Sequence, residues 1–178
     1  MSRELMILRH GKSDWDSGAA DDYHRPLAKR GRKAVKRMAE WLREHARLPA
    51  RIVSSPATRA RETTQRLCRH AGLAESIVIW EEAVYGADVP TLLQVLAEHG
   101  DDARGDIGDA PVLLVGHNPG LEDLVIFLAG APIDAPAGRS ALPTAALVQM
   151  ELPADWRALD RGCARLLTVI RPGELAGP

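Results

Sequence analysis

Leu5-Met6-Ile7-Leu8-Arg9-His10-Gly11, close to the first residue, is the stretch from which the fold can be worked out. Four apolar residues followed by a polar pair and a glycine are typical of a buried strand that ends in a tight turn. Ligands of open α/β sheets bind at the carboxyl ends of the strands, so we expect a site that contains Arg9 and His10. Arginine offers a planar fork of donors to phosphate oxygens, and a neutral imidazole can attack phosphorus. Taken alone, this turn points to phosphate chemistry only weakly, because ordinary surface turns also hold such residues.

The composition of the whole chain narrows the class of protein. We expect a single domain over residues 1–178, since this length is enough to bury a proper core. The formal net charge of -1 makes a nucleic acid or a membrane surface an unexpected partner. No apolar run is long enough to span a bilayer. Cys68 and Cys163 are too few for a disulfide framework or a zinc site, and we see no signal-peptide pattern, so we expect the cytoplasm.

Strand-like and helix-like patterns alternate along the chain. Apolar residues at spacings of three and four predict helices over residues 28–46, 56–71, 90–99 and 119–128. Short apolar runs predict strands over residues 5–8, 51–54, 76–79 and 111–116, and a closing hairpin over 144–152 and 165–170. This alternation predicts an α/β sheet with its site at the carboxyl edge of the strands.

Two further residues are expected at the same edge. Arg59 lies in the first turn of a predicted helix, where the helix N-terminus favours an anion and where a cation is otherwise unfavourable. His117 follows another predicted strand, just before the next helix. Separate strand ends would therefore bring Arg9, His10, Arg59 and His117 together. Two guanidinium groups and a second imidazole can orient and neutralise a phosphoryl group while His10 attacks in line.

Four other polar residues are candidates for substrate binding. Lys12, Ser13 and Arg25 lie in the long loop behind the first turn, and each of them could equally well only solvate that loop. Asn118 follows His117 directly and is a natural helix N-cap.

Glu82 is a candidate general acid, because it follows the third predicted strand together with Glu81. The alternative is a pair of solvated loop acids. His10, His117 and Glu82 could in principle hold a metal ion, but the two neighbouring arginines would repel a cation. We therefore expect neither a metal nor another cofactor.

The helix predicted over residues 28–46 is strongly basic outside its apolar face. Its cations are Lys29, Arg30, Arg32, Lys33, Lys36, Arg37 and Arg43. A solvated helix surface is the simpler interpretation of this pattern. The alternative is a docking face for an acidic protein partner.

Taken together, the motifs resemble those of the histidine phosphatase superfamily, also called the phosphoglycerate mutase-like family. They are Arg9-His10-Gly11, Ser54-Ser55-Pro56-Ala57-Thr58-Arg59-Ala60-Arg61-Glu62-Thr63 and Gly116-His117-Asn118, in the order of the family. Within the superfamily, the chain is most similar to SixA-type phosphohistidine phosphatases. That similarity rests on Arg9-His10-Gly11-Lys12-Ser13-Asp14-Trp15, Arg25-Pro26-Leu27, Val115-Gly116-His117-Asn118-Pro119-Gly120 and Pro143-Thr144.

The resemblance implies a three-layer α/β/α fold, with a mainly parallel sheet that has an antiparallel edge strand. It implies that His10 is the nucleophile and that Arg9, Arg59 and His117 form a pocket for phosphate or sulfate. Glu82 lies where the mutases carry their acid, whereas SixA-type members often lack a clear acid there.

We therefore expect a metal-independent phosphatase that works through a phosphohistidine intermediate and removes phosphate from phosphohistidine in a protein. The segment between Tyr85 and His117 is short where the mutases carry a long covering insertion, which favours an open pocket that admits a protein side chain. Two alternatives remain, a small-molecule phosphomonoesterase of the same superfamily and a phosphoryl-binding module without turnover.

Overall fold

A computed structural model describes residues 2–101 and 107–175. The described ranges contain, in chain order, β1 (Ser2–Arg9), α1 (Lys29–His45), β2 (Arg51–Ser54), α2 (Thr58–Ala71), β3 (Val78–Trp80), α3 (Val89–His99), β4 (Val112–Gly116), α4 (Gly120–Ala129), β5 (Leu147–Pro153) and β6 (Arg165–Ile170). Single turns of 3₁₀-helix lie at Glu75–Ile77, Glu82–Val84 and Pro172–Glu174.

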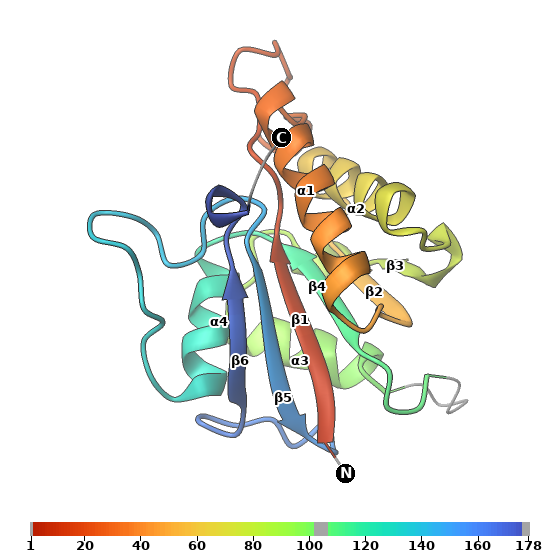
Figure 1. Ribbon diagram of the computed structural model, residues 1–178, viewed down its shortest axis with the longest axis vertical. Helices are drawn as coiled ribbons and strands as arrows, with labels where there is room; N and C mark the ends of the chain where they lie inside the picture. Colours follow the sequence, from red (N-terminus) through yellow and green to blue (C-terminus); the bar gives the residue numbers. More distant parts are fainter. Residues whose placement is uncertain (1, 102–106, 176–178) are drawn as a thin grey trace.

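The strands form one sheet in the order β3-β2-β4-β1-β5-β6. β1 and β2 both pair with β4 in parallel, and β3 pairs with β2 in parallel. β5 runs antiparallel to β1, and the edge strand β6 runs antiparallel to β5 (Figure 1). The expected sheet, mainly parallel and with an edge strand that pairs antiparallel with its neighbour, is thereby confirmed.

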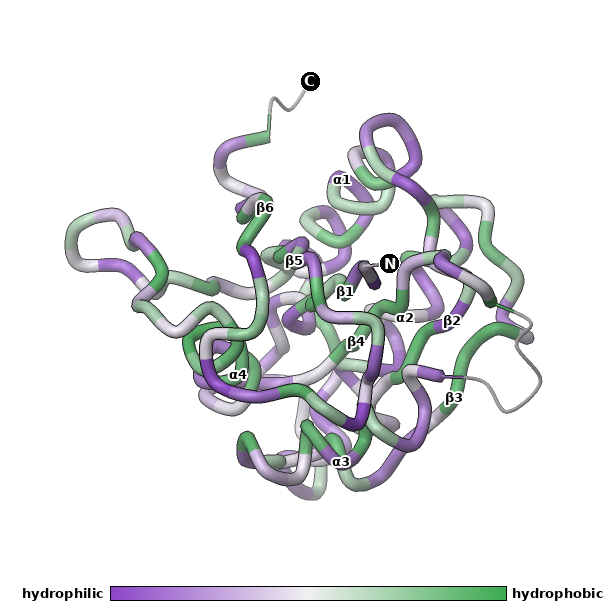
Figure 2. Tube along the Cα trace, turned by 90° about the horizontal axis from the view of Figure 1, so that it is seen from below, coloured by the Kyte–Doolittle hydropathy of each residue, from purple (hydrophilic) through white to green (hydrophobic). Residues whose placement is uncertain are grey.

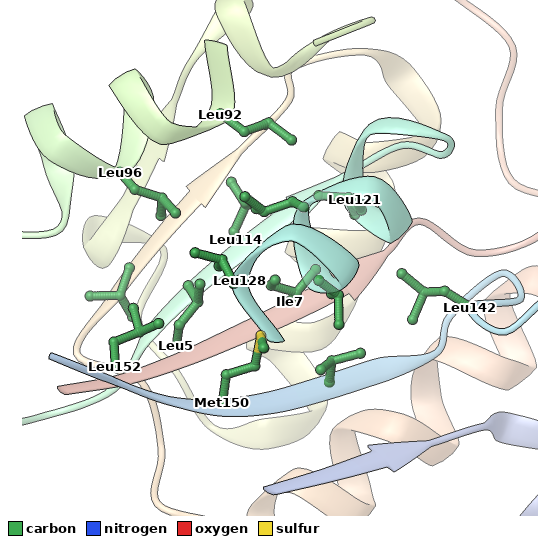
Figure 3. Packing of buried hydrophobic residues seen from close by; sticks show 14 of the residues in the cluster. Leu5, Ile7, Leu92, Leu96, Leu114, Leu121, Leu128, Leu142, Met150 and Leu152 are labelled. Carbon is green, nitrogen blue, oxygen red and sulfur yellow. The ribbon is translucent and has the colours of Figure 1, made fainter. Parts of the chain in front are cut away.

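Successive side chains of a strand point to opposite faces of the sheet, and a hydrophobic core lies on each face. In β1, Met6 and Leu8 pack with α1 and α2, whereas Leu5 and Ile7 pack with α3 and α4, and all four side chains are fully buried. Figure 2 shows α1 on one side of the central strands and α3 and α4 on the other. Figure 3 shows the second core, in which Leu92 and Leu96 of α3 and Leu121 and Leu128 of α4 face residues of the sheet that include Leu5, Ile7, Leu114 and Met150. These are the three expected layers.

None of the described helices is long and apolar enough to cross a bilayer. Several predicted boundaries were wrong by a few residues. The third strand begins at Val78 because the chain before it makes a 3₁₀ turn. Helices α2 and α4 begin at Thr58 and Gly120, later than Pro56 and Pro119, because the chain first makes a turn beyond each strand end. Those turns carry side chains of the candidate site.

Candidate active site

The ends of β1, β2 and β4 carry the four core residues of the predicted site. Arg9 is the last residue of β1 and lies opposite Gly116, the last residue of β4. The next residues are therefore neighbours, and the backbone N–H of His10 donates to the carbonyl of Gly116 at 3.0 Å. His117 follows on β4, and Arg59 lies in the first turn of α2, shortly after β2. The sheet register thus brings together what the sequence predicted.

His10 is held with the lone pair of one ring nitrogen accepting a long hydrogen bond from Nε of Arg59. Its Nδ1 lies 2.6 Å from the carbonyl oxygen of Gly11, which can only accept, so Nδ1 carries the proton and Nε2 keeps its lone pair. The Nε2 atom lies 3.4 Å from Nε of Arg59. The ring centroids of His10 and His117 are 5.1 Å apart. A phosphoryl group at Nε2 would therefore meet a guanidinium and a second imidazole.

A buried threonine fixes the turn that follows His10. The backbone N–H of Gly11 donates to Oγ1 of Thr63 at 3.0 Å, and the Thr63 hydroxyl donates to the carbonyl of Arg59 at 2.7 Å. These two bonds tie the end of β1 to the first turns of α2. A Cβ atom on Gly11 would come within 2.9 Å of Cγ2 of Val35 in α1, so the close packing of this turn requires a glycine.

Both imidazoles are neutral at ordinary pH. Burial, followed by the nearby His117, Arg59 and Arg9, lowers the pKa of His10 to about 3, although the hydrogen bond to Gly11 opposes this shift. Burial and then Arg59 lower the pKa of His117 to about 4. A neutral imidazole is the nucleophilic form, so the same charges that would bind a phosphoryl group also keep His10 reactive.

His117 is anchored through one nitrogen only. Its Nε2 lies 2.8 Å from Oγ of Ser55, whose oxygen accepts the backbone N–H of Ala57 at 3.2 Å and whose hydroxyl hydrogen can be donated to Nε2. Within residues 2–101 and 107–175, the buried side-chain atoms without a hydrogen-bond partner are Nδ1 of His117, Nε of Arg9 and Nε of Arg25. Such atoms are unusual, and all three belong to residues that we expected to bind phosphate oxygens.

Asp22 is a member of the site that the sequence analysis missed. Its carboxylate accepts from Nη2 of Arg25 at 2.7 Å, from Nη2 of Arg59 at 2.9 Å and from the hydroxyl of Tyr85 at 2.8 Å. The hydrogen bond from Arg25, and then those from Tyr85 and Arg59, hold the pKa of this carboxyl well below its usual range. Asp22 is therefore ionised and orients Arg59. The only signal in the sequence was an acid three residues before Arg25 in a polar loop.

The other candidate binding residues lie around the core of the site. Ser13 is buried, and its hydroxyl accepts from Nη1 of Arg25. Asn118 donates to the carbonyl of Leu142 at 2.9 Å, which also accepts Nη1 of Arg9 at 3.0 Å, so Asn118 and Arg9 share one anchor. Lys12 does not contact the four core residues through any described hydrogen bond, and it lines a neighbouring hollow instead.

No hydrogen bond among the described residues joins Glu82 to Arg9, His10, Arg59 or His117. Its carboxylate accepts from the hydroxyl of Tyr23 at 2.9 and 3.1 Å. The Tyr23 ring packs edge-on against Tyr85 at 4.9 Å between centroids, and Tyr85 packs edge-on against His117 at 5.4 Å. Two aromatic rings thus connect Glu82 to His117.

A cluster of three residues that could bind a metal ion lies elsewhere in the described part of the chain. Glu81, Glu98 and His99 offer ligand atoms within 4.8 Å of one another. His99 already pairs with Glu81 at 2.9 Å. This cluster contains none of His10, His117 and Glu82, the three residues considered above as a metal triad.

The low pKa values predict an activity that persists in acid. We expect kcat/KM, corrected for the ionisation of the substrate, to stay level from about pH 8 to about pH 5, because His10 remains neutral there, whereas an unperturbed imidazole would be mostly protonated at the lower pH. Activity should fall only as the pH approaches about 4 and about 3, the pKa values of His117 and His10. The measurement is a pH profile of kcat/KM. An acid limb near pH ~6.5 would contradict this description of the pocket.

Comparisons with known proteins support the motifs found here. Residues 5–83 match the family described as the histidine phosphatase superfamily (branch 1). The chain is 32% identical over 166 residues to an uncharacterized protein of Mycobacterium tuberculosis, covering 90% of this chain and 96% of that protein. It is 30% identical over 116 residues to the phosphohistidine phosphatase SixA of Escherichia coli K12, covering 65% of this chain and 68% of SixA. A solved structure of the protein histidine phosphatase SixA complexed with tungstate has a TM-score of 0.75 at 26% identity, covering 97% of this chain and 99% of that one.

Proposed function

The chain belongs to the histidine phosphatase superfamily and is a phosphatase of the SixA type, and on that basis we propose that it removes the phosphoryl group from phosphohistidine in a protein without a metal ion. The observation that carries this proposal is the state of His10. Its Nε2 is unprotonated, it lies 3.4 Å from the guanidinium of Arg59, and it belongs to a ring next to His117.

The reaction that we propose has two displacements at phosphorus. In the first, the lone pair of Nε2 of His10 forms a bond to phosphorus while the bond from phosphorus to the nitrogen of the substrate breaks, and the substrate imidazole leaves with that electron pair. In the second, a water oxygen attacks phosphorus, the bond to His10 breaks, and inorganic phosphate is released. One water proton stays on the attacking oxygen and the other passes to a phosphate oxygen, while His10 leaves as the neutral imidazole that keeps its proton on Nδ1.

Guanidinium groups would supply the charge that other phosphatases obtain from metal ions. Arg59 contacts Nε2 of His10, the charge of Arg9 also acts on the His10 ring, and Arg25 binds the same carboxylate, Asp22, that orients Arg59. When the Ser55 hydroxyl donates to Nε2, the neutral ring of His117 carries its proton on the unpaired Nδ1, and it would donate that proton to a phosphoryl oxygen. Stabilising the charge that spreads over the equatorial oxygens is the main task in phosphoryl transfer.

A general acid would matter only for some leaving groups. An imidazole leaves readily, so phosphohistidine needs little help from a proton donor, whereas an ester oxygen needs one. We propose Glu82 for that task, acting through a rearrangement of the contact with Tyr23. Lys12, Ser13, Arg25 and Asn118 are proposed to bind or frame the substrate.

Two further statements belong to the proposal. We infer that residues 1–178 act as one domain, because β1 at one end of the chain pairs with β5 near the other. We place the reaction in the cytoplasm, because Cys68 and Cys163 are free thiols.

The test compares substrates and metal dependence in the same protein. We expect faster phosphate release from a protein phosphorylated on histidine than from sugar phosphates, and equal rates with and without excess chelator. Faster turnover of the sugar phosphates would favour the small-molecule phosphomonoesterase instead. A loss of activity in chelator that added metal restores would overturn the metal-independent mechanism.

A further inference from the structure

A second hollow lies beside the phosphate pocket. Its volume is about 450 Å³, and its walls come from α1, from the loop over residues 136–144 and from the turn at residues 171–174. Lys12, two residues beyond His10, lines this hollow. Pro143 also lines it, next to Leu142, whose carbonyl accepts from Arg9. The hollow and the phosphate pocket therefore share a wall, and we call the hollow the cationic groove.

The cationic groove is lined by six basic side chains and one acid. They are Lys12, Arg30, Lys33, Arg37, Arg139, Arg171 and, as the acid, Glu174. Arg171 is engaged in the fold, since it donates to the carbonyls of Ala141 and Asp134 and pairs with Glu174. Among the residues that the structure describes, the side chains of the other five cations have neither a hydrogen bond nor an ion pair. Their charge is thus available to a partner.

Part of this charge forms a regular stripe along α1. Arg30, Lys33, Ala34 and Arg37 line the groove at spacings of three, four and seven residues, so they share one face of the helix. At 1.5 Å per residue the stripe is about 10 Å long, which is about two helical turns. A single phosphoryl group would reach only one end of it, whereas a chain segment with several carboxylates would follow its length.

We propose that the cationic groove binds an acidic segment of the phosphoprotein whose phosphohistidine enters the pocket. This inference rests on the proposed function and adds the chemistry of the partner. The apolar part of the wall, which includes Ala34, Pro136 and Pro143, suits a protein surface better than a bare polyanion. Opposite charges on the two surfaces would speed the encounter and fix its orientation, so the groove should act on KM and leave the chemical step unchanged.

The test uses two double variants of the full chain that lose the same charge from the same helix. Lys33→Gln with Arg37→Gln alters the groove. Lys29→Gln with Lys36→Gln is the control, because neither residue lines the groove and Lys36 pairs with Glu40. The substrates are an acidic phosphotransfer domain phosphorylated on histidine and free phosphohistidine. We expect the groove variant to raise KM for the domain about tenfold at low salt, with kcat unchanged, and to leave free phosphohistidine within about twofold of the parent.

Three results would overturn the inference: an equal rise in KM for the control variant, an equal loss on free phosphohistidine, or no change for the domain. Binding of the unphosphorylated domain, followed by fluorescence anisotropy, separates the inference from the proposed function because it needs no turnover. If the parent binds the domain through the groove yet does not hydrolyse its phosphohistidine, the proposed function fails and the docking site stands. If the groove variant binds the unphosphorylated domain as well as the parent does, the docking site fails.

Discussion

Replacing His10 with alanine is expected to lower kcat by about 10⁴-fold or more and to abolish the covalent phosphoenzyme. The side chain lost is the nucleophile, and His117 would not substitute for it, since its Nε2 contacts Oγ of Ser55 at 2.8 Å and its Nδ1 carries the ring proton in the proposed tautomer. The measurement is hydrolysis of an aryl phosphate, combined with acid-free trapping of the phosphorylated protein and location of the label. The label should lie on His10 of the parent and be absent from the variant.

His45→Ala is the matched control for this variant, because His45 lies at the exposed end of α1 and stacks on Trp41. Its activity should equal that of the parent. His10→Asn keeps a polar side chain in the buried position. It replaces the alanine variant in the test if that variant does not fold. Equal slow rates in the parent and in a folded His10 variant would mean that the pocket binds phosphoryl groups without turning them over.

The second large effect is expected for Arg59→Ala, which should lower kcat/KM by about 10²–10³-fold, as the loss of one stabilising donor does at other sites. Arg59 is the cation closest to Nε2 of His10 among the described contacts, and it is also bound to Asp22. Its removal leaves the Asp22 carboxylate without that partner beside the pocket, so phosphate should bind more weakly as well. The measurements are kcat/KM and the inhibition constant of inorganic phosphate.

Arg61→Ala serves as the control, because the Arg61 guanidinium lies over the Trp80 ring at 4.4 Å. Arg59→Lys keeps the charge but not the planar fork, and it should recover only part of the loss. The fold should persist in Arg59→Ala, since the side chain binds a loop and not the hydrophobic core. If thermal unfolding shows that this variant does not fold, Arg59 is a structural residue and its assignment to the pocket is wrong.

The sequence was enough to predict how the core of the site is assembled. The apolar run before Arg9, and the run before His117, each required a strand, and parallel strands end at one edge of a sheet. The structure agrees with this reasoning, because the register of β1 with β4 places Arg9 opposite Gly116, so that His10 and His117 follow at the same edge of the sheet. Residues that lie at the ends of regular elements can be placed in this way without any knowledge of their contacts.

The loop residues could not be predicted in the same way. Asp22 lies in a segment without apolar periodicity, and its three partners come from its own loop, from α2 and from the turn after β3. Only the folded chain brings them together. Ser55 presents a related difficulty, because it lies just before α2, where its hydroxyl oxygen accepts the N–H of Ala57, and it also contacts His117. A polar residue near a helix start can serve the helix or a neighbouring element, and local spacing does not distinguish the two.

The position of β1 in the sheet has a consequence for synthesis on the ribosome. β1 precedes the other five described strands in the chain, yet its two neighbours are β4 and β5, and Leu5 is aligned with Val112 and Met150. A nascent chain that ends after α3 therefore carries the apolar residues 5–8 of β1 without either of their partner strands, and can bury them in the sheet only when later segments have been made. The candidate site is therefore completed only after β4 has been made, although Arg9 and His10 are translated about 100 residues earlier.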